Sequence, residues 1–439
     1  MTTSLPEGAT PPPLPLQGLD VLFEGKRSAL FWLALKSGFW TVLTLGFYRF
    51  WMKTRLRRWY WSAIRPGGHP LEYVGDPLEK LLGFFIAVVI LTFYIGIVNL
   101  ALMFVSFSVF QSSAVGYTAS FLGVIPVWFY AQYRARRYVL GRTRWRGVRF
   151  GLEKGAWGYA WRALVHWLIT IVSAGLLWPR MTFWLEKYKT DRTYFGSARL
   201  EQGGNWWMLY RAAIPFALGL VLFAGLTLWL FWLDPVIPYS TEWFSGDAER
   251  IEDQFWTEGI AGNLMQVIRL LWLIPAMLVM VYGAVHYRFA SRRILASHKR
   301  AVGVQMRSKL NSLRISVIYV LGTTIAYLLL FVGIFSILGL ALSLLGAGTF
   351  LEAQIGGVEP FGALPRLISV AILAALYLSV FLFWSVLHNV FVTYPLMRHM
   401  AVTLSLRDVA GLADISQRAR DEFAEAEGFA EALDLGAAI

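Results

Sequence analysis

The amino-acid sequence predicts an all-α membrane protein: a polytopic helical bundle of six transmembrane helices in three hairpins, with two short re-entrant or interfacial helices and small cytoplasmic β elements. The chain has 439 residues, of which 57% are hydrophobic and 15% are charged, whereas soluble domains are typically about 25% charged. No Asp, Glu, Lys or Arg occurs from Leu81 to Tyr133. Several apolar stretches reach the ~20 residues that a helix needs to cross a bilayer.

Six of these stretches are long enough to be predicted as spans. They pair along the chain into three hairpins, with a polar or acidic connection between the two members of each pair. The predicted spans are Leu81–Gln111 with Ala114–Tyr133, Ala212–Leu233 with Leu264–Tyr287, and Ile315–Leu345 with Leu367–Pro395.

The distribution of charge orients these spans. The basic segments 49–65, 134–154 and 288–314 fall on one side of the membrane in this arrangement, and the acidic loops 234–258 and 346–365 fall on the other. Lys and Arg collect in short cytoplasmic loops of membrane proteins. The sequence therefore predicts a multi-pass membrane protein with both termini in the cytoplasm.

Two shorter apolar stretches, Ser28–Tyr48 and Ala163–Pro179, have basic residues on both sides. A full crossing by either would carry a basic segment to the outer face, so we expect these stretches to re-enter the membrane or to lie at its surface. Trp32–Trp51 aligns without gaps to Trp161–Arg180, at an offset of 129 residues, which indicates an internal repeat. The third hairpin has no clear copy of the short helix.

These features predict five segments along the chain. A disordered Pro-rich lead without signal-peptide character comes first and an acidic cytoplasmic tail comes last. In the tail, apolar residues from Ile415 to Leu433 recur at helical spacing, so it forms either an amphipathic helix docked on the basic face or a solvated tail. "RGVRFG" and "LEYVG" are typical of short strands. The segments are 1–22 (lead), 23–150 (membrane repeat 1), 151–310 (membrane repeat 2), 311–406 (third hairpin) and 407–439 (tail).

Two motifs carry a resemblance to a known family. "TLGFYRFW" (Thr44–Trp51), followed by a basic helix, and "EGFAEALDLG" (Glu427–Gly436) are similar to the bacterial YjgN-like family of inner-membrane proteins. The resemblance extends from about Phe23 to Gly436, with Ala430-Glu431 where the family pattern suggests Ala-Asp. It implies an inner-membrane location and a multi-pass topology. The family is one of unknown function, so the resemblance implies no activity.

Basic segments rich in aromatic residues are candidates for binding anionic lipid head groups. Each Lys or Arg near a negatively charged leaflet contributes about 1 kcal/mol, although ordinary interfacial anchoring explains the same composition. Nucleic-acid binding is disfavoured, because the basic clusters follow membrane spans and no nucleic-acid-binding module is present. The candidate head-group residues are Arg55, Arg57, Arg58, Arg136, Arg137, Arg292 and Arg293.

Polar residues in or beside the apolar stretches are candidates for lining a pathway, because such residues are costly in a membrane and often functional. The alternative is that the cationic side chains extend to the interface and that the others form hydrogen bonds between helices. These residues are Lys36, Arg162, His166, His286, His388 and Asn389.

The sequence leaves two hypotheses for function. It contains no recognisable catalytic motif, no cysteine and no metal-ligand spacing among its histidines, so we predict no cofactor and consider an enzyme the less favoured class. The first hypothesis is a transporter or channel for a small solute or lipid, with the short helices lining the route. The second is a non-transporting membrane module that binds anionic lipids or scaffolds a partner protein.

Overall fold

The computed structural model describes residues 18–110, 113–234, 236, 268–345 and 366–418. The second predicted acidic loop, nearly all of the first, and the tail beyond Arg418 lie outside the described residues. Helices dominate the described chain, and five of them are long and apolar enough to cross a membrane. The prediction of a helical membrane protein is therefore confirmed. The five candidate spans are Ala114–Gly141, Trp206–Leu233, Arg269–Ser297, Ser312–Ser336 and Tyr377–Val402.

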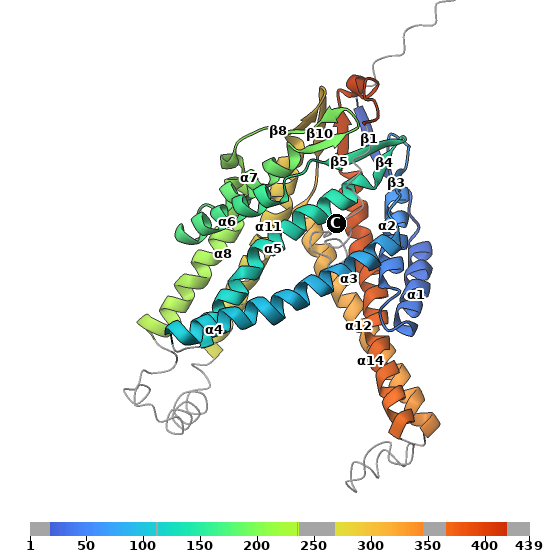
Figure 1. Ribbon diagram of the computed structural model, residues 1–439, viewed down its shortest axis with the longest axis vertical. Coiled ribbons are helices and arrows are strands. Elements are labelled where there is room, and N and C mark those ends of the chain that lie inside the picture. The colour runs from blue at the N-terminus through green and yellow to red at the C-terminus, as the bar shows by residue number, and fades with distance from the viewer. Residues whose placement is uncertain (1–17, 111–112, 235, 237–267, 346–365, 419–439) are drawn as a thin grey trace, which may run out of the picture. The chain divides into compact units, whose positions relative to one another are not determined.

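Figure 1 shows the helices of the described chain. They are α1 (Arg27–Leu43), α2 (Arg49–Ala63), α3 (Pro77–Phe93), α4 (Asn99–Phe110), α5 (Ser113–Gly141), α6 (Ala156–Val172), α7 (Trp178–Thr190), α8 (Tyr210–Leu228), α11 (Leu273–Ser297), α12 (Ser312–Leu345), α14 (Arg366–His388) and α15 (Tyr394–Val402). The π-helical turns η1 (Tyr94–Val98), η3 (Trp229–Leu233) and η7 (Asn389–Thr393) continue them. The 3-10 turns are η2 (Trp206–Leu209), η6 (Arg269–Trp272) and η8 (Val409–Leu412).

The predicted span Leu81–Gln111 corresponds to α3, η1 and α4, which follow one another without a break from Pro77 to Phe110. Within this helix, residues 96–109 form an apolar stretch shorter than a full span.

Eleven short strands form two antiparallel sheets in the described chain. The two strands predicted from sequence are confirmed as β3 and β5. The six-stranded sheet has the order β2-β1-β11-β10-β9-β8 and the five-stranded sheet the order β3-β4-β5-β6-β7. The strands are β1 (Gly18–Phe23), β2 (Ile64–Pro66), β3 (Leu71–Tyr73), β4 (Thr143–Trp145), β5 (Val148–Leu152), β6 (Thr193–Phe195), β7 (Ala198–Arg199), β8 (Glu201–Gln202), β9 (Lys299–Ala301), β10 (Val304–Ser308) and β11 (Leu404–Arg407).

The structure corrects two sequence predictions at the ends of the chain. Strand β1 includes residues 18–22, which the sequence assigned to the disordered lead. Leu19 of β1 lies opposite Leu406 of β11, and a partner so distant in sequence leaves no local pattern. At the other end, residues 413–418 are turn and irregular chain rather than the start of an amphipathic helix. The remainder of that predicted helix lies outside the described residues.

Every helix pair in the described chain is bounded by two strands that hydrogen-bond to each other. Strands β1 and β2 flank α1–α2, β3 and β4 flank α3–α5, β5 and β6 flank α6–α7, β8 and β9 flank α8–α11, and β10 and β11 flank α12–α15. In each case, three residues link the first strand of the pair to the helix that follows. These linkers are residues 24–26, 74–76, 153–155, 203–205 and 309–311.

The two short helix pairs, α1–α2 and α6–α7, have the same turn. Leu45 and Gly46 have φ of 51° and 95°, and Ala174 and Gly175 have φ of 48° and 85°. The amide of Gly46 donates to the carbonyl of Thr41 at 2.7 Å, and the amide of Gly175 donates to the carbonyl of Thr170 at 2.8 Å. Glycine adopts such positive φ without steric cost, which explains its presence at this point of both turns.

The chain divides into two compact units. The first contains the described residues up to Gly203, Ala296–Lys309 and those from Val317 onward, and it includes both sheets. One of its cores packs Leu30 of α1 and Tyr60 of α2 against Val386 of α14. A second core packs side chains of α5, α6 and α7 around Tyr133, Ala163 and Tyr188.

The second unit contains residues 204–295 and 310–316. Here two glycines bring helices α8 and α11 close together. A Cβ on Gly283 would lie 2.4 Å from Cα of Phe216, and one on Gly219 would lie 2.6 Å from Cα of Met280. Glycine at helix crossings permits this close backbone approach, as in many membrane helix pairs.

Candidate functional site

A pocket rich in arginine, which we call the arginine pocket, lies in the first unit where α5 ends and the five-stranded sheet begins. Its volume is about 270 Å³. Helix α5, which is long and apolar enough to cross a membrane, ends at Gly141, and Gly141 is one of the lining residues. The residues that line it are Val74, Glu79, Arg137, Gly141, Arg142, Arg144, Arg149, Phe150, Gly151, Leu152, Tyr194, Gln417 and Arg418.

One wall of the pocket is held by Arg142 and Glu79. Nε of Arg142 donates to Oε2 of Glu79 at 2.8 Å, and the hydroxyl of Tyr138 donates to the same oxygen at 3.0 Å. The Arg142 guanidinium lies 3.9 Å from the centre of the Tyr138 ring, and the residue is only 7% exposed. Glu79 therefore compensates Arg142. The adjacent Arg137 is buried and donates from Nε to the carbonyl of Leu152 at 2.9 Å.

A second wall is formed by two strands of the sheet. Arg144 on β4 lies directly opposite Arg149 on β5. Nε of Arg144 is buried and has no hydrogen-bond partner among the described residues. Like charges directly opposite on paired strands destabilise a sheet.

Tyr194 lines the pocket from β6, the strand on the other side of β5 from Arg144. It pairs with Gly151 across β5 and β6. A Cβ on Gly151 would lie 2.1 Å from Cζ of Tyr194, so a side chain at this position would displace the ring.

The C-terminal segment completes the rim of the pocket. The amide of Arg149 donates to Oε1 of Gln417 at 2.9 Å, and the amide of Ser197 donates to the carbonyl of Ser416 at 2.8 Å. The Arg418 guanidinium lies 4.5 Å from the centre of the Tyr194 ring. The beginning of the predicted tail thus docks on the five-stranded sheet.

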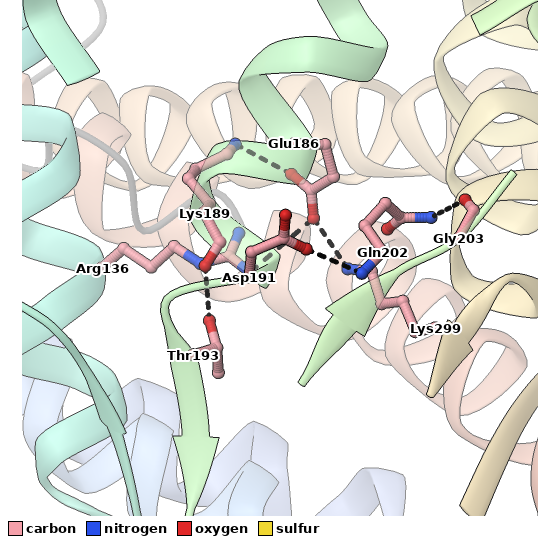
Figure 2. Close-up of polar contacts among 8 residues, drawn as sticks. All are labelled: Arg136, Glu186, Lys189, Asp191, Thr193, Gln202, Gly203 and Lys299. Atoms are coloured by element: carbon pink, nitrogen blue, oxygen red, sulfur yellow. Dashed lines mark hydrogen bonds and ion pairs between the residues drawn. The ribbon is translucent and has the colours of Figure 1, made fainter. Parts of the chain in front are cut away.

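A second polar cluster surrounds Glu186 of α7 (Figure 2). Its Oε1 accepts a hydrogen bond from Nζ of Lys299 at 2.7 Å and lies 3.7 Å from NH2 of Arg136, while its Oε2 lies 2.9 Å from Nζ of Lys189. Burial by itself would raise the pKa of Glu186. The charges of Lys189, Lys299 and Arg136, with the hydrogen bond from Lys299, instead hold that pKa well below its ordinary value.

The Glu186 cluster joins α5, α7 and β9 through one carboxylate. The adjacent Asp191 extends it to the sheet, because its Oδ1 accepts the amide of Gln202 at 2.8 Å and its Oδ2 lies 3.0 Å from Nζ of Lys187. Both carboxylates of this cluster are thus occupied by partners within the protein. The cluster is therefore a structural connection between helices and sheet rather than an open site.

The predicted pathway residues are dispersed over the described helices. Arg162 and His166 lie one turn apart on α6, and Nδ1 of His166 lies 2.8 Å from the carbonyl of Arg162. In the second unit, Nδ1 of His286 lies 2.7 Å from the hydroxyl of Ser312. The remaining three are in the first unit: Lys36 lines a shallow pocket between aromatic side chains of α1 and Leu382, and His388 and Asn389 adjoin at the start of η7.

The predicted head-group arginines differ in exposure. Arg55, Arg58 and Arg293 are exposed, whereas Arg136 and Arg292 are partly buried. Arg57 is only 6% exposed and packs against the rings of Trp61 and Tyr73, a position away from any surface. Arg137 is the one member of the set that lines the arginine pocket.

Both short helix pairs present apolar side chains on their surface, most of all near the turns. Leu45 is 79% exposed and Val172 is 80% exposed. Other exposed apolar residues of the two pairs are Trp32, Phe39, Trp40, Leu43, Phe47, Trp157, Trp161, Trp167, Leu168, Ile171, Leu176, Trp178 and Trp184.

Sequence reasoning identified the basic segment around Arg144 but not the pocket. The neighbouring residues that shape it, Glu79, Tyr194 and Gln417, come from distant parts of the chain. The one local signal was the β-strand pattern of "RGVRFG", which placed Arg149 on a strand. Among the described residues, no group of three His, Cys, Asp or Glu side chains could hold a metal ion.

The apolar helices and their strand-bounded pairs define a helical membrane protein. Residues 18–329 match the family described as bacterial proteins of unknown function (DUF898), and the chain belongs to this family. The match begins at the first residue of β1 and ends within α12. No curated protein and no solved structure matches the chain. The YjgN-like resemblance is the same family, so that identification is confirmed.

Proposed function

We propose that the chain is a multi-pass protein of the bacterial cytoplasmic membrane that binds anionic lipids at the cytoplasmic surface. In this proposal α1–α2 and α6–α7 are inserted in the cytoplasmic leaflet. The observation that carries it is the apolar surface of both short helix pairs around their turns. Contiguous apolar surface of this kind is unfavourable in water and favourable against lipid.

The strand pairing supports a topology in which all helix pairs leave and return on one side. Strands that hydrogen-bond in one sheet lie on the same side of a membrane, because open sheet edges are not stable within lipid. Strands β2 and β3 belong to different sheets but are joined by residues 67–70 alone. All eleven strands then share one side. Each helix pair crosses twice or re-enters, and both termini are on the strand side.

The length of the short helix pairs favours re-entry over crossing. At 1.5 Å per residue, the 17-residue helices α1 and α6 are about 26 Å long, whereas the hydrocarbon core is about 30 Å thick. The three longer pairs provide six spans in three hairpins. Because the basic segments adjoin the strands, the positive-inside rule assigns the strand side to the cytoplasm.

The recurring turn supports an internal duplication. The turns at Gly46 and Gly175 share their backbone conformation and hydrogen bonds at the offset of 129 residues that the sequence alignment gives. Strands β10 and β11 have the same pairing as β5 and β6, with Met306 opposite Leu406 as Phe150 is opposite Phe195. Because β10–β11 corresponds to β5–β6, helices α12–α15 occupy the place that α6–α7 has in the other sheet. This explains why no short helix pair precedes α12.

Exposed arginines on α2 provide the lipid contacts in this proposal. Arg55 and Arg58 are both exposed, on the helix that follows the first apolar turn. Arg58 donates from NH2 to the carbonyl of Gly75 at 2.9 Å, and the remaining guanidinium nitrogens carry further donors. Guanidinium groups bind phosphate oxygens with paired hydrogen bonds.

The alternative is a transporter or channel in which the short helices line a route. The π-helical turns η1, η3 and η7 favour it to some degree, since π-turns within helices often mark functional sites. This alternative predicts water at the turns of the short pairs. Their apolar residues instead favour contact with lipid.

Lipid retention tests the proposal. The purified chain is reconstituted in nanodiscs with increasing phosphatidylglycerol in phosphatidylcholine, and bound lipids are counted by native mass spectrometry after extraction. We expect wild type to retain phosphatidylglycerol and Arg55→Gln/Arg58→Gln to retain it about tenfold more weakly. The matched control is Arg199→Gln, an exposed arginine on β7. Equal retention of both lipids by wild type would contradict the proposal.

A further inference from the structure

We propose that the arginine pocket is a binding site for a phosphate group, either free or on a lipid head group. This inference goes beyond the surface binding of lipids proposed above and does not require the short helix pairs to lie in the membrane. It concerns a different surface, formed by the end of α5, strands β4 and β5, and the C-terminal segment.

The charged residues that line the pocket are mostly basic. Five arginines line it, at positions 137, 142, 144, 149 and 418, and Glu79 is the one acidic side chain among the lining residues. Glu79 is engaged by Arg142 and Tyr138. Among the described residues that line the pocket there are thus five guanidinium groups and one carboxylate, and an anion is the ligand that such a lining favours.

Arg144 and Arg149 lie opposite each other on paired strands of the pocket wall. The placement of two like charges directly opposite each other on paired strands costs free energy. An anion lying between the two guanidinium groups would reverse that repulsion. Nε of Arg144, buried and without a hydrogen-bond partner among the described residues, is a donor available to it.

A second β-hairpin of the first unit, β9–β10, has the same turn as β4–β5 but not the opposed arginines. Strands β4 and β5 turn at Arg146-Gly147, with φ of 53° and 80°, and β9 and β10 turn at Val302-Gly303, with φ of 46° and 80°. In the second hairpin the position of Arg149 is occupied by Gln305, opposite Arg300. The scaffold thus tolerates glutamine where the pocket has arginine, so the opposed arginines are not needed for the fold.

The chemistry of the donors selects the ligand class. A guanidinium group offers parallel N–H donors that match two oxygens of a phosphate. The pocket lies at the end of a helix that is long and apolar enough to cross a membrane, so a phosphate group on a lipid is a candidate ligand as well as a free one. A phosphate group on a lipid and a free phosphate monoester share this chemistry, so the test must separate them.

The test uses the full chain purified in neutral detergent and two probes. Inorganic phosphate is titrated at constant ionic strength by calorimetry, and phosphatidic acid is titrated in mixed micelles. We expect at least one probe to bind wild type and to bind Arg149→Gln about tenfold more weakly. Arg144→Gln is the second variant, and Arg300→Gln, at the equivalent position of the other hairpin, is the matched control with wild-type affinity.

The outcomes separate the two sources. Binding of phosphate alone, or of both probes, with the loss in Arg149→Gln assigns a free phosphate group, and binding of phosphatidic acid alone with the same loss assigns a lipid head group. Binding of neither probe to wild type would overturn the inference, as would equal affinities of Arg149→Gln and Arg300→Gln. A failure of lipid retention at Arg55 and Arg58 leaves this result unaffected, so the two proposals fail separately.

Discussion

The hydroxyl of Thr41 lies 3.7 Å from the sulfur of Met52, across the turn that joins α1 to α2. The hydroxyl of Thr170 lies 3.7 Å from the sulfur of Met181 across the turn between α6 and α7. Each threonine also donates to the carbonyl four residues earlier, at 2.8 and 2.7 Å. The two turns are therefore stabilised by the same contacts, and substitutions in them test whether the turns contribute to stability.

Replacing the turn glycine by alanine should destabilise the protein. Gly46 has φ of 95° and no neighbouring heavy atom within 4 Å of an added Cβ, so the cost of Gly46→Ala comes from backbone strain alone. We expect a loss of about 1–3 kcal/mol in the free energy of unfolding, measured by chemical denaturation in detergent. Gly333→Ala in helix α12 is the control and should be neutral or slightly stabilising. Equal free energies of unfolding for Gly46→Ala and Gly333→Ala would contradict the role assigned to the turn.

Removing the carboxylate of Glu186 should destabilise the protein more strongly. Glu186→Gln leaves Lys189 and Lys299 without their anionic partner in a largely buried cluster, at a cost of about 3 kcal/mol. The control Glu153→Gln removes a more exposed pair with Arg199 and should change stability by less than about 1 kcal/mol. Unfolding curves of the two variants in the same detergent make the comparison. Similar losses would show that the Glu186 cluster is not a structural connection.

Stability should also depend on pH through Glu186. Because its pKa is lowered in the folded protein, the ionised form contributes stability that is present above the unfolded-state pKa of about 4.3 and is lost as pH falls below it. Wild type should therefore lose more stability on acidification than Glu186→Gln does. The measurement is the unfolding free energy of both proteins from pH 6 down to about pH 3.5. Parallel pH profiles would mean that the pKa of Glu186 is not lowered.

The close approach of α8 and α11 predicts a steric effect. A Cβ at Gly283 would meet the backbone of Phe216, which cannot move as a side chain could. Gly283→Ala should therefore cost about 1–3 kcal/mol, observed as a lower melting temperature in detergent. Gly225→Ala on α8, where an added Cβ meets nothing within 4 Å, should leave the melting temperature unchanged. An unchanged value for both would show that the two helices can separate without cost.

The membrane helices and the recurrence of the short pairs were predictable because both are local patterns. Apolar length identifies a span, and the residues around Gly46 and Gly175 repeat at a fixed offset. The sheets were largely missed, because strands of two to six residues pair with partners elsewhere in the chain: Leu19 with Leu406 is the clearest case. The arginine pocket was missed for the same reason, since Glu79, Tyr194 and Gln417 meet Arg149 only in the folded chain.

The most direct test of the account is the depth of the two short turns in a membrane. The chain has no native cysteine, so single spin labels can be placed at Leu45→Cys and Leu176→Cys, with Ser62→Cys at the strand end of α2 as the control. Labels in reconstituted vesicles are probed with oxygen, which concentrates in lipid, and with a water-soluble nickel chelate. The account predicts that oxygen reaches the labels at 45 and 176 and the chelate does not, while the label at 62 shows the opposite. Access of the chelate to all three would contradict insertion of the turns in lipid and favour a water-filled route.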